Sequence, residues 1–80
     1  MMKLIIVSLK GKTEHHVVWI EINTLDGNFV LQPNYTPTTF VLAAHKDFTY
    51  CLTTGKLETI TLEKQALLSI TRTSALLLLN

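Results

Sequence analysis

Residues 48–62, FTYCLTTGKLETITL, carry the strongest structural signal in this sequence. Two runs rich in β-branched and aromatic residues, Phe48–Leu52 and Leu57–Leu62, flank the short polar segment TTGK at residues 53–56. Such runs around a glycine-containing turn are typical of a β-hairpin. Because alternate residues of a strand lie on the same side, Ile60 and Leu62 are expected to share one face, with the intervening threonines opposite.

The same pattern of short strands and turns continues in both directions from this hairpin. Further strands are expected at Met2–Ser8, His15–Asn23, Phe29–Leu31, Thr39–Ala44, Ala66–Thr71 and Ala75–Leu79. Turn or loop residues separate them at Lys10–Lys12, Leu25–Asn28, Pro33–Pro37 and Arg72–Ser74. Val, Ile and Thr make up 23 of the 80 residues, and no window has helical periodicity. The sequence predicts an all-β fold, an antiparallel β-sandwich or barrel of about eight to ten short strands, in one domain over residues 1–80.

For two strands, the sequence also predicts in which direction the side chains point. Met2–Ser8 is nearly all apolar, which predicts burial on both faces. In the second strand, Val18, Ile20 and Ile22 are expected to point one way and Val17 and Trp19 the other.

The composition excludes some classes of partner. Seven Lys or Arg oppose six Asp or Glu, and the net charge is +1. Nucleic-acid binders need a basic patch, and these cations are scattered, so nucleic acid is disfavoured as a partner. The chain is 48% hydrophobic and only 16% charged, below the usual ~25% charged. The low charge indicates that a partner covers part of the surface.

The sequence also bears on compartment and membrane. Cys51 is the only cysteine, so no intrachain disulfide forms and a reducing compartment is expected. The apolar run Leu4–Val7 is too short for a signal peptide, and Leu76–Leu79 is too short to span a bilayer. A soluble protein, or one docked onto something larger, is expected.

The candidate nucleophile and metal ligands do not form a recognisable site. His15 and His16 are adjacent on a strand, so their side chains face opposite sides and cannot jointly chelate a metal. Cys51 has no base or cation beside it in sequence, so a buried structural thiol is expected.

The remaining polar signals are also weak. Glu21 and Asp26 are expected to be solvated charges rather than a catalytic pair, and the three glycines are isolated and open no helix. We therefore expect no catalytic residue, no cofactor and no metal.

Residues 24–37, TLDGNFVLQPNYTP, form the most specific motif. They resemble the run T-x-E-G-x-F-G-I-L-P-N-H-A-P of the ε subunit of F-type (rotary) ATP synthases. Five residues fall on matching positions: Gly27, Phe29, Pro33, Asn34 and Pro37. Asp26 stands for the family's acid, whereas Val30 and Tyr35 replace its glycine and histidine.

The resemblance covers Leu4 to Leu79 and implies the N-terminal β-sandwich domain of that subunit. LIIVS at residues 4–8 is similar to the family's opening strand, and residues 55–62 align with a later hairpin. The chain stops where the family's C-terminal helical hairpin begins. It is therefore expected neither to inhibit ATP hydrolysis nor to bind ATP through such a hairpin.

The resemblance implies a non-catalytic central-stalk (rotor) subunit of an F-type or F1-like ATP synthase or ATPase. Such a subunit packs on γ and contacts the c-ring, and so helps couple proton or sodium translocation to ATP synthesis or hydrolysis. It is peripheral to the membrane, on the cytoplasmic face or the equivalent organelle interior. The interaction residues implied by position are Asp26, Gly27, Asn28, Phe29, Pro33, Asn34, Tyr35 and Pro37.

Two other classes of function stay open at this point. An unrelated small β-sandwich or barrel could bind a ligand or single-stranded nucleic acid, with aromatic residues as a stacking platform. A small enzyme is the third class, although no nucleophile, base and orienting residue come together in the sequence.

Overall fold

The computed structural model describes residues 1–79, and these residues form eight strands and no helix. The strands are β1 (Met2–Ser8), β2 (Gly11–Thr24), β3 (Gly27–Leu31), β4 (Thr38–Leu42), β5 (Asp47–Leu52), β6 (Leu57–Thr61), β7 (Ala66–Ile70) and β8 (Ser74–Leu78). Every strand expected from the sequence is present, most within one or two residues of its expected bounds. The all-β prediction is confirmed.

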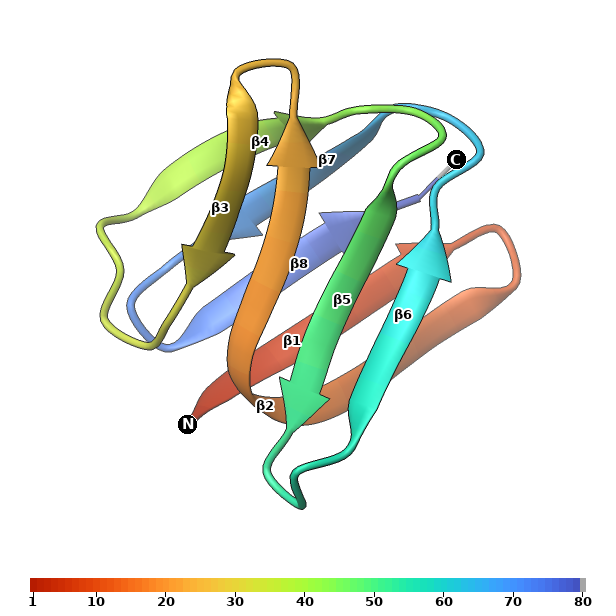
Figure 1. Ribbon diagram of the computed structural model, residues 1–80. Helices are drawn as coiled ribbons and strands as arrows, with labels where there is room; N and C mark the ends of the chain where they lie inside the picture. Colours follow the sequence, from red (N-terminus) through yellow and green to blue (C-terminus); the bar gives the residue numbers. More distant parts are fainter. Residues whose placement is uncertain (80) are drawn as a thin grey trace.

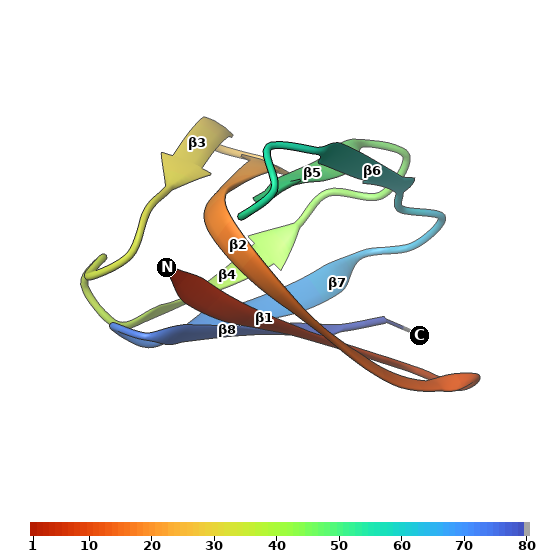
Figure 2. The same cartoon turned by 90° about the horizontal axis from the view of Figure 1, so that it is seen from below.

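The strands form two layers, as Figures 1 and 2 show. One layer contains β3, β2, β5 and β6, and the other contains β1, β8, β7 and β4. The long strand β2 joins the layers, since its first half pairs with β1 and its second half with β3 and β5. The result is a small sandwich with a barrel-like closure at β2.

The sheet is mixed rather than wholly antiparallel, which corrects the sequence prediction. β1 and β8 pair in parallel, with Leu4 opposite Ala75 and Ile6 opposite Leu77, and the other pairs are antiparallel. Short turns force antiparallel pairing between consecutive strands. The first and last strands are joined by no turn, so turn spacing could not predict their direction.

A β-bulge changes which residues of β2 face the core. The register against β5 shifts between Val17 and Trp19. Val17 is fully buried with Ile20 and Ile22, whereas Val18 is 38% exposed. The expectation that Val18 shares a face with the two isoleucines was therefore wrong. A bulge inserts one residue into the alternation, and residues before it change sides.

The core lies between the inward faces of the two layers. Its largest fully buried side chains are Phe48, Met2, Leu4, Ile20, Ile22, Leu31, Leu42, Leu68, Ile70, Leu77 and Val17. No buried side-chain nitrogen or oxygen among residues 1–79 lacks a hydrogen-bond partner. The core is thus almost purely apolar, and burial of apolar area is its main stabilising term.

Candidate interaction surfaces

The structure separates the sequence-predicted interaction residues into two groups at opposite ends of β3. Asp26, Gly27 and Asn28 lie at the β2–β3 turn, and residues 33–37 lie in the β3–β4 loop (Figure 1). A five-residue strand spans about 13 Å between its first and last Cα atoms, at ~3.3 Å per residue. One flat partner surface at an end of the sandwich therefore cannot contact both groups.

The β2–β3 turn is organised by Thr24. Its Oγ1 accepts a hydrogen bond from the Asp26 N–H at 3.0 Å and donates one to the Gly27 carbonyl at 3.1 Å. Gly27 has a φ of 130°, a conformation that L side chains rarely adopt, so a glycine is required there. The Asn28 amide donates to Glu21 and Asn23. The turn is fixed in shape, and the Asp26 side chain is exposed on it with no ion-pair partner within residues 1–79.

The β3–β4 loop is held mainly by packing. Asn34, at a φ of 69°, donates its N–H to the Arg72 carbonyl, which ties the loop to the β7–β8 turn. The Tyr35 ring lies 6.3 Å from the Phe40 ring, and Phe40 lies 5.8 Å from Phe29. Phe29 and Tyr35 are half-buried, so their visible role is to pack the loop onto the sandwich. Asn34 and Pro37 remain exposed.

The turns and loops gather at these same two ends. The Asp26 end comprises the β2–β3 turn with the loops at residues 43–46 and 62–65, linked by backbone hydrogen bonds from Ala43 to Asn23 and from His45 to Leu62. The Tyr35 end comprises the loop at 32–37 and the turns at 53–56 and 71–73. Exposed charges are more numerous at the Asp26 end, where Asp26, Lys46, Glu63 and Lys64 are exposed.

A feature that sequence reasoning missed lies on the outer side of the β1-β8-β7-β4 layer. We call it the apolar face, and it consists of Ile5, Val7, Val41, Leu67, Leu76 and Leu78. Cross-strand register places Val41, Leu67, Leu78 and Val7 in one row and puts Ile5 opposite Leu76 in the next. Val41, Leu67 and Leu78 are 50%, 45% and 41% exposed, and the other three are half-buried.

This face explains the apolar character of β1. Met2, Leu4 and Ile6 point into the core, and Ile5 and Val7 point outward onto the apolar face. The expected burial of β1 on both faces is therefore not met by residues 1–79 alone, because only one side is covered. A strand that is apolar on both sides is typically covered on both sides. The sequence of β1 therefore carried a signal that its outer side needs a cover that residues 1–79 do not supply.

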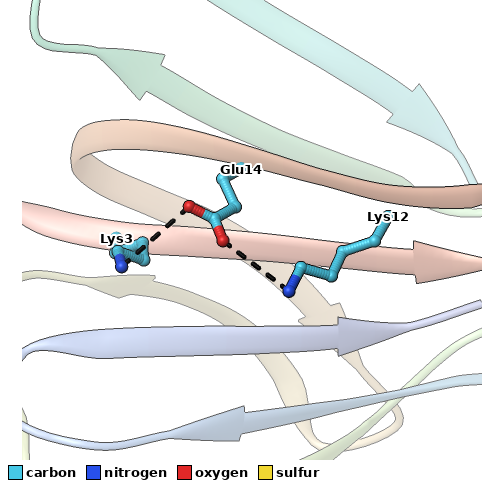
Figure 3. Close-up of polar contacts among 3 residues, drawn as sticks. All are labelled: Lys3, Lys12 and Glu14. Carbon is cyan, nitrogen blue, oxygen red and sulfur yellow. Dashed lines mark ion pairs between the residues drawn. The ribbon is translucent and has the colours of Figure 1, made fainter.

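Polar residues border the apolar face at the β1–β2 hairpin. The Glu14 carboxylate lies 4.0 Å from the Lys3 Nζ and 3.8 Å from the Lys12 Nζ (Figure 3). Glu14 is opposite Ile5 across β1 and β2, so this group stands directly beside the apolar rows. An apolar centre with a charged rim is the composition of a protein–protein interface.

The outer side of the other layer is mainly polar. Asn23 donates its amide to the Asp47 carbonyl at 3.1 Å, and Thr61 donates to the Asp47 carboxylate at 2.9 Å. Thr49 and Thr59 share a further hydrogen bond across β5 and β6. Because these groups satisfy one another in water, this side has no need of a covering partner. The two outer sides of the sandwich therefore differ in kind.

His15, His16 and Cys51, the candidate titratable residues from the sequence, differ in their surroundings. The His15 ring packs 5.3 Å from the Tyr50 ring, and its Nε2 lies 3.2 Å from the Thr13 Oγ1, while His16 is exposed. Cys51 is buried, as expected. Burial first, and the Glu58 carboxylate second, raise the pKa of Tyr50. No group of three His, Cys, Asp or Glu side chains within residues 1–79 is placed to hold a metal ion.

Within residues 1–79, no helix combines the length and apolarity needed to cross a bilayer.

Comparison with known proteins identifies the fold. No family model and no curated protein matches this sequence. Among solved structures, a chain of the Tetrahymena thermophila mitochondrial ATP synthase, from a structure of the central stalk and c-ring, matches with a TM-score of 0.75 and 11% sequence identity. The match covers 96% of this chain and 61% of that one, so this chain spans under two thirds of its neighbour's length. The fold of this chain is one that occurs in the central stalk and c-ring assembly of an ATP synthase.

Proposed function

We propose that this chain is a non-catalytic rotor subunit of an F-type or F1-like ATP synthase or ATPase, equivalent to the sandwich domain of ε. It packs on the γ subunit and contacts the c-ring. The observation that supports this proposal most strongly is the fold. Over 96% of its length, this chain shares it with a chain from the structure of an ATP synthase central stalk and c-ring. The motif at residues 24–37 supports the ε assignment, because its matching residues Pro33, Asn34 and Pro37 lie in a loop outside the hydrophobic core, where burial does not dictate the residue type.

The apolar face is the proposed γ-binding surface. A broad side of the molecule measures about 28 by 27 Å, and the area of that side is similar to the ~800 Å² that each partner contributes to a stable interface. Leaving Val41, Leu67 and Leu78 in water is unfavourable by roughly 25 cal/mol for each Å² of apolar area. Their burial against γ would recover that free energy and fix the subunit rigidly to the shaft.

The Asp26 end is the proposed c-ring contact. Its turn presents an unpaired carboxylate on a backbone that Thr24 and Gly27 hold in one shape. An exposed ion pair with a ring cation contributes only about 0–1 kcal/mol, so Asp26 would set orientation more than affinity. Phe29, Pro33 and Tyr35 then act indirectly, by holding β3 and its following loop, while Asn34 and Pro37 lie at the far end.

Co-purification tests the rotor assignment. The chain, tagged and expressed in its source cells, should recover a γ-type subunit and c subunits after mild detergent extraction. Recovery is compared with cells that express the tag alone. Failure to recover either subunit above that control would refute the proposed function.

Site-directed cross-linking tests the orientation. In a Cys51→Ser background, a cysteine at Asp26 (D26C) should cross-link to c subunits, and one at Asn34 (N34C) should not. Both positions are exposed and lie at opposite ends of β3, so they are matched in accessibility. Cross-linking from Asn34 alone would reverse the orientation, and cross-linking from neither would remove the c-ring contact.

A further inference from the structure

A third candidate surface is the outer edge of β6. Within residues 1–79, β6 pairs only with β5, through five consecutive residue pairs with no register shift. β6 contains no proline and no bulge, two of the features that commonly protect an edge strand. By contrast, the other edge strand of this layer, β3, is followed closely by Pro33.

The hydrogen-bond pattern shows which main-chain groups are free on this edge. Leu62 donates its N–H to Lys46, and Leu52 donates to Lys56. In an antiparallel ladder the bonded residues alternate, so the even-numbered residues of β6 bond to β5. The N–H and C=O groups of Leu57, Thr59 and Thr61 therefore point away from β5.

A groove lies beside this edge, between β6 and the β1–β2 hairpin. It has a volume of about 460 Å³, and its apolar lining residues are Ile60 from β6, Leu62 directly after β6, and Leu9 and Leu79 from the opposite side. Figure 2 shows that β6 and the β1–β2 hairpin belong to different layers of the sandwich. An extra strand on β6 would therefore place alternate side chains over an apolar floor.

The charges around the groove identify the partner's chemistry. Lys10 and Lys64 line it and make no ion pair within residues 1–79, whereas Glu63 is the one acidic lining residue. At the other end of β6, Glu58 is already paired with Lys56 at 3.1 Å. Two lysines against one glutamate give the groove-lining residues a net positive charge. The Asp47 carboxylate, which accepts a hydrogen bond from Thr61, belongs to the outer side of the layer and does not line the groove.

We propose that the β6 edge binds an extended acidic segment of a partner protein, which adds to the sheet as a further strand. Main-chain hydrogen bonds to Leu57, Thr59 and Thr61 provide affinity. Apolar residues at alternate positions enter the groove, and flanking carboxylates meet Lys10 and Lys64. This surface is separate from the apolar face and from the Asp26 end, and it does not depend on the proposed rotor function.

Amide exchange measured by NMR tests the proposal directly. The probe is the synthetic peptide Ac-EEVTVTVEE-NH2, and its control replaces every glutamate by lysine. In the free protein, the amides of Leu57, Thr59 and Thr61 should exchange much faster than those of Glu58 and Ile60. Saturating acidic peptide should slow the three exposed amides by about tenfold or more. Unchanged exchange at these three amides would overturn the proposal.

Matched variants separate the main-chain contact from the side chain. Thr59→Pro removes one outward N–H but none of the main-chain bonds to β5, and should weaken peptide binding by about tenfold. It also loses the side-chain hydrogen bond to Thr49, which Thr59→Val loses as well. Thr59→Val removes the hydroxyl and keeps the N–H, so it should bind like the wild type. Equal affinity of the proline variant, with its fold confirmed by the NMR spectrum, would contradict strand addition.

Charge reversal tests the acidic character of the partner. Lys10→Glu combined with Lys64→Glu should weaken binding by about threefold to tenfold. Arg72→Glu, at the opposite end of the molecule, should leave binding unchanged. Equal binding of the lysine control peptide would refute the charge argument. Concentration-dependent dimerisation of the free chain that Thr59→Pro abolishes would show that the occupant is a second copy, and would also overturn the proposal.

Discussion

Leu67 and Leu68 are neighbours on β7, and replacing each by alanine tests how the two sides of the β1-β8-β7-β4 layer differ. Leu68 is fully buried between the layers, and Leu67 is 45% exposed on the apolar face. The two substitutions are identical in chemistry and equal in their effect on strand propensity. Any difference in stability between them therefore reports burial.

The expected difference is large for a domain of this size. Leu68→Ala leaves a cavity in the core and should cost about 2–5 kcal/mol. Leu67→Ala creates no enclosed cavity and should cost about 1 kcal/mol or less, in line with partly exposed positions. Total stability at ~0.05–0.15 kcal/mol per residue is about 4–12 kcal/mol for 80 residues. Leu68→Ala thus removes a large share of it.

Urea unfolding and thermal unfolding, each monitored by Trp19 fluorescence and by circular dichroism, provide the assay. Leu68→Ala should lower the thermal midpoint by about 8–40 °C, and Leu67→Ala by no more than about 8 °C, at ~4–8 °C per kcal/mol. Equal losses for the two variants of the isolated chain would refute the assignment of Leu67 to an uncovered surface.

Three further outcomes are expected. Gly27→Ala should destabilise the fold by about 1–3 kcal/mol in urea unfolding, because the φ of 130° at this residue is strained for an L side chain. No atom lies within 4 Å of the added Cβ, so a clash adds nothing to this cost, and a neutral effect would show that the turn relaxes. The raised pKa of Tyr50 means that the fold favours the neutral phenol, so this stabilisation is complete below about pH 10 and is lost as the pH rises through the folded-state pKa. Wild type should therefore lose more stability than Tyr50→Phe as the pH rises above about 10, and parallel losses would contradict this reasoning. Cys51, 8% exposed, should react with a thiol reagent far more slowly in the folded protein than in urea, and comparable rates would mean that β5 opens readily.

The strands could be predicted from sequence because their ends carry strong local signals. Gly27 and Gly55 mark turns, and the two prolines mark the β3–β4 loop, so the predicted strand bounds lie close to the observed ones. Non-local features could not be predicted in the same way. The β1–β8 pairing joins residues far apart in sequence, and the bulge at Val17–Trp19 arises from pairing with β5, which no property of β2 alone reveals.

The candidate site was predicted only in part for a related reason. The motif at residues 24–37 reads as one continuous segment, yet β3 places Asp26 and Tyr35 at opposite ends of the sandwich. Tyr35 also proved to be a packing residue against Phe40. The apolar face is assembled from four strands, and its members are identifiable only once the register shows that Val41, Leu67, Leu78 and Val7 lie in one row.

The most direct test of the central claim compares one exposed valine on each outer side of the sandwich. Val41 lies on the apolar face and is 50% exposed, and Val30 lies on the mainly polar side and is 53% exposed. Tagged Val41→Lys and Val30→Lys chains, each verified to be folded, are expressed in the source cells, and the recovered γ-type subunit is quantified. The account predicts that Val30→Lys recovers γ like the wild type and that Val41→Lys loses most of it. Undiminished recovery with Val41→Lys would contradict the claim that this chain docks on the rotor through its apolar face.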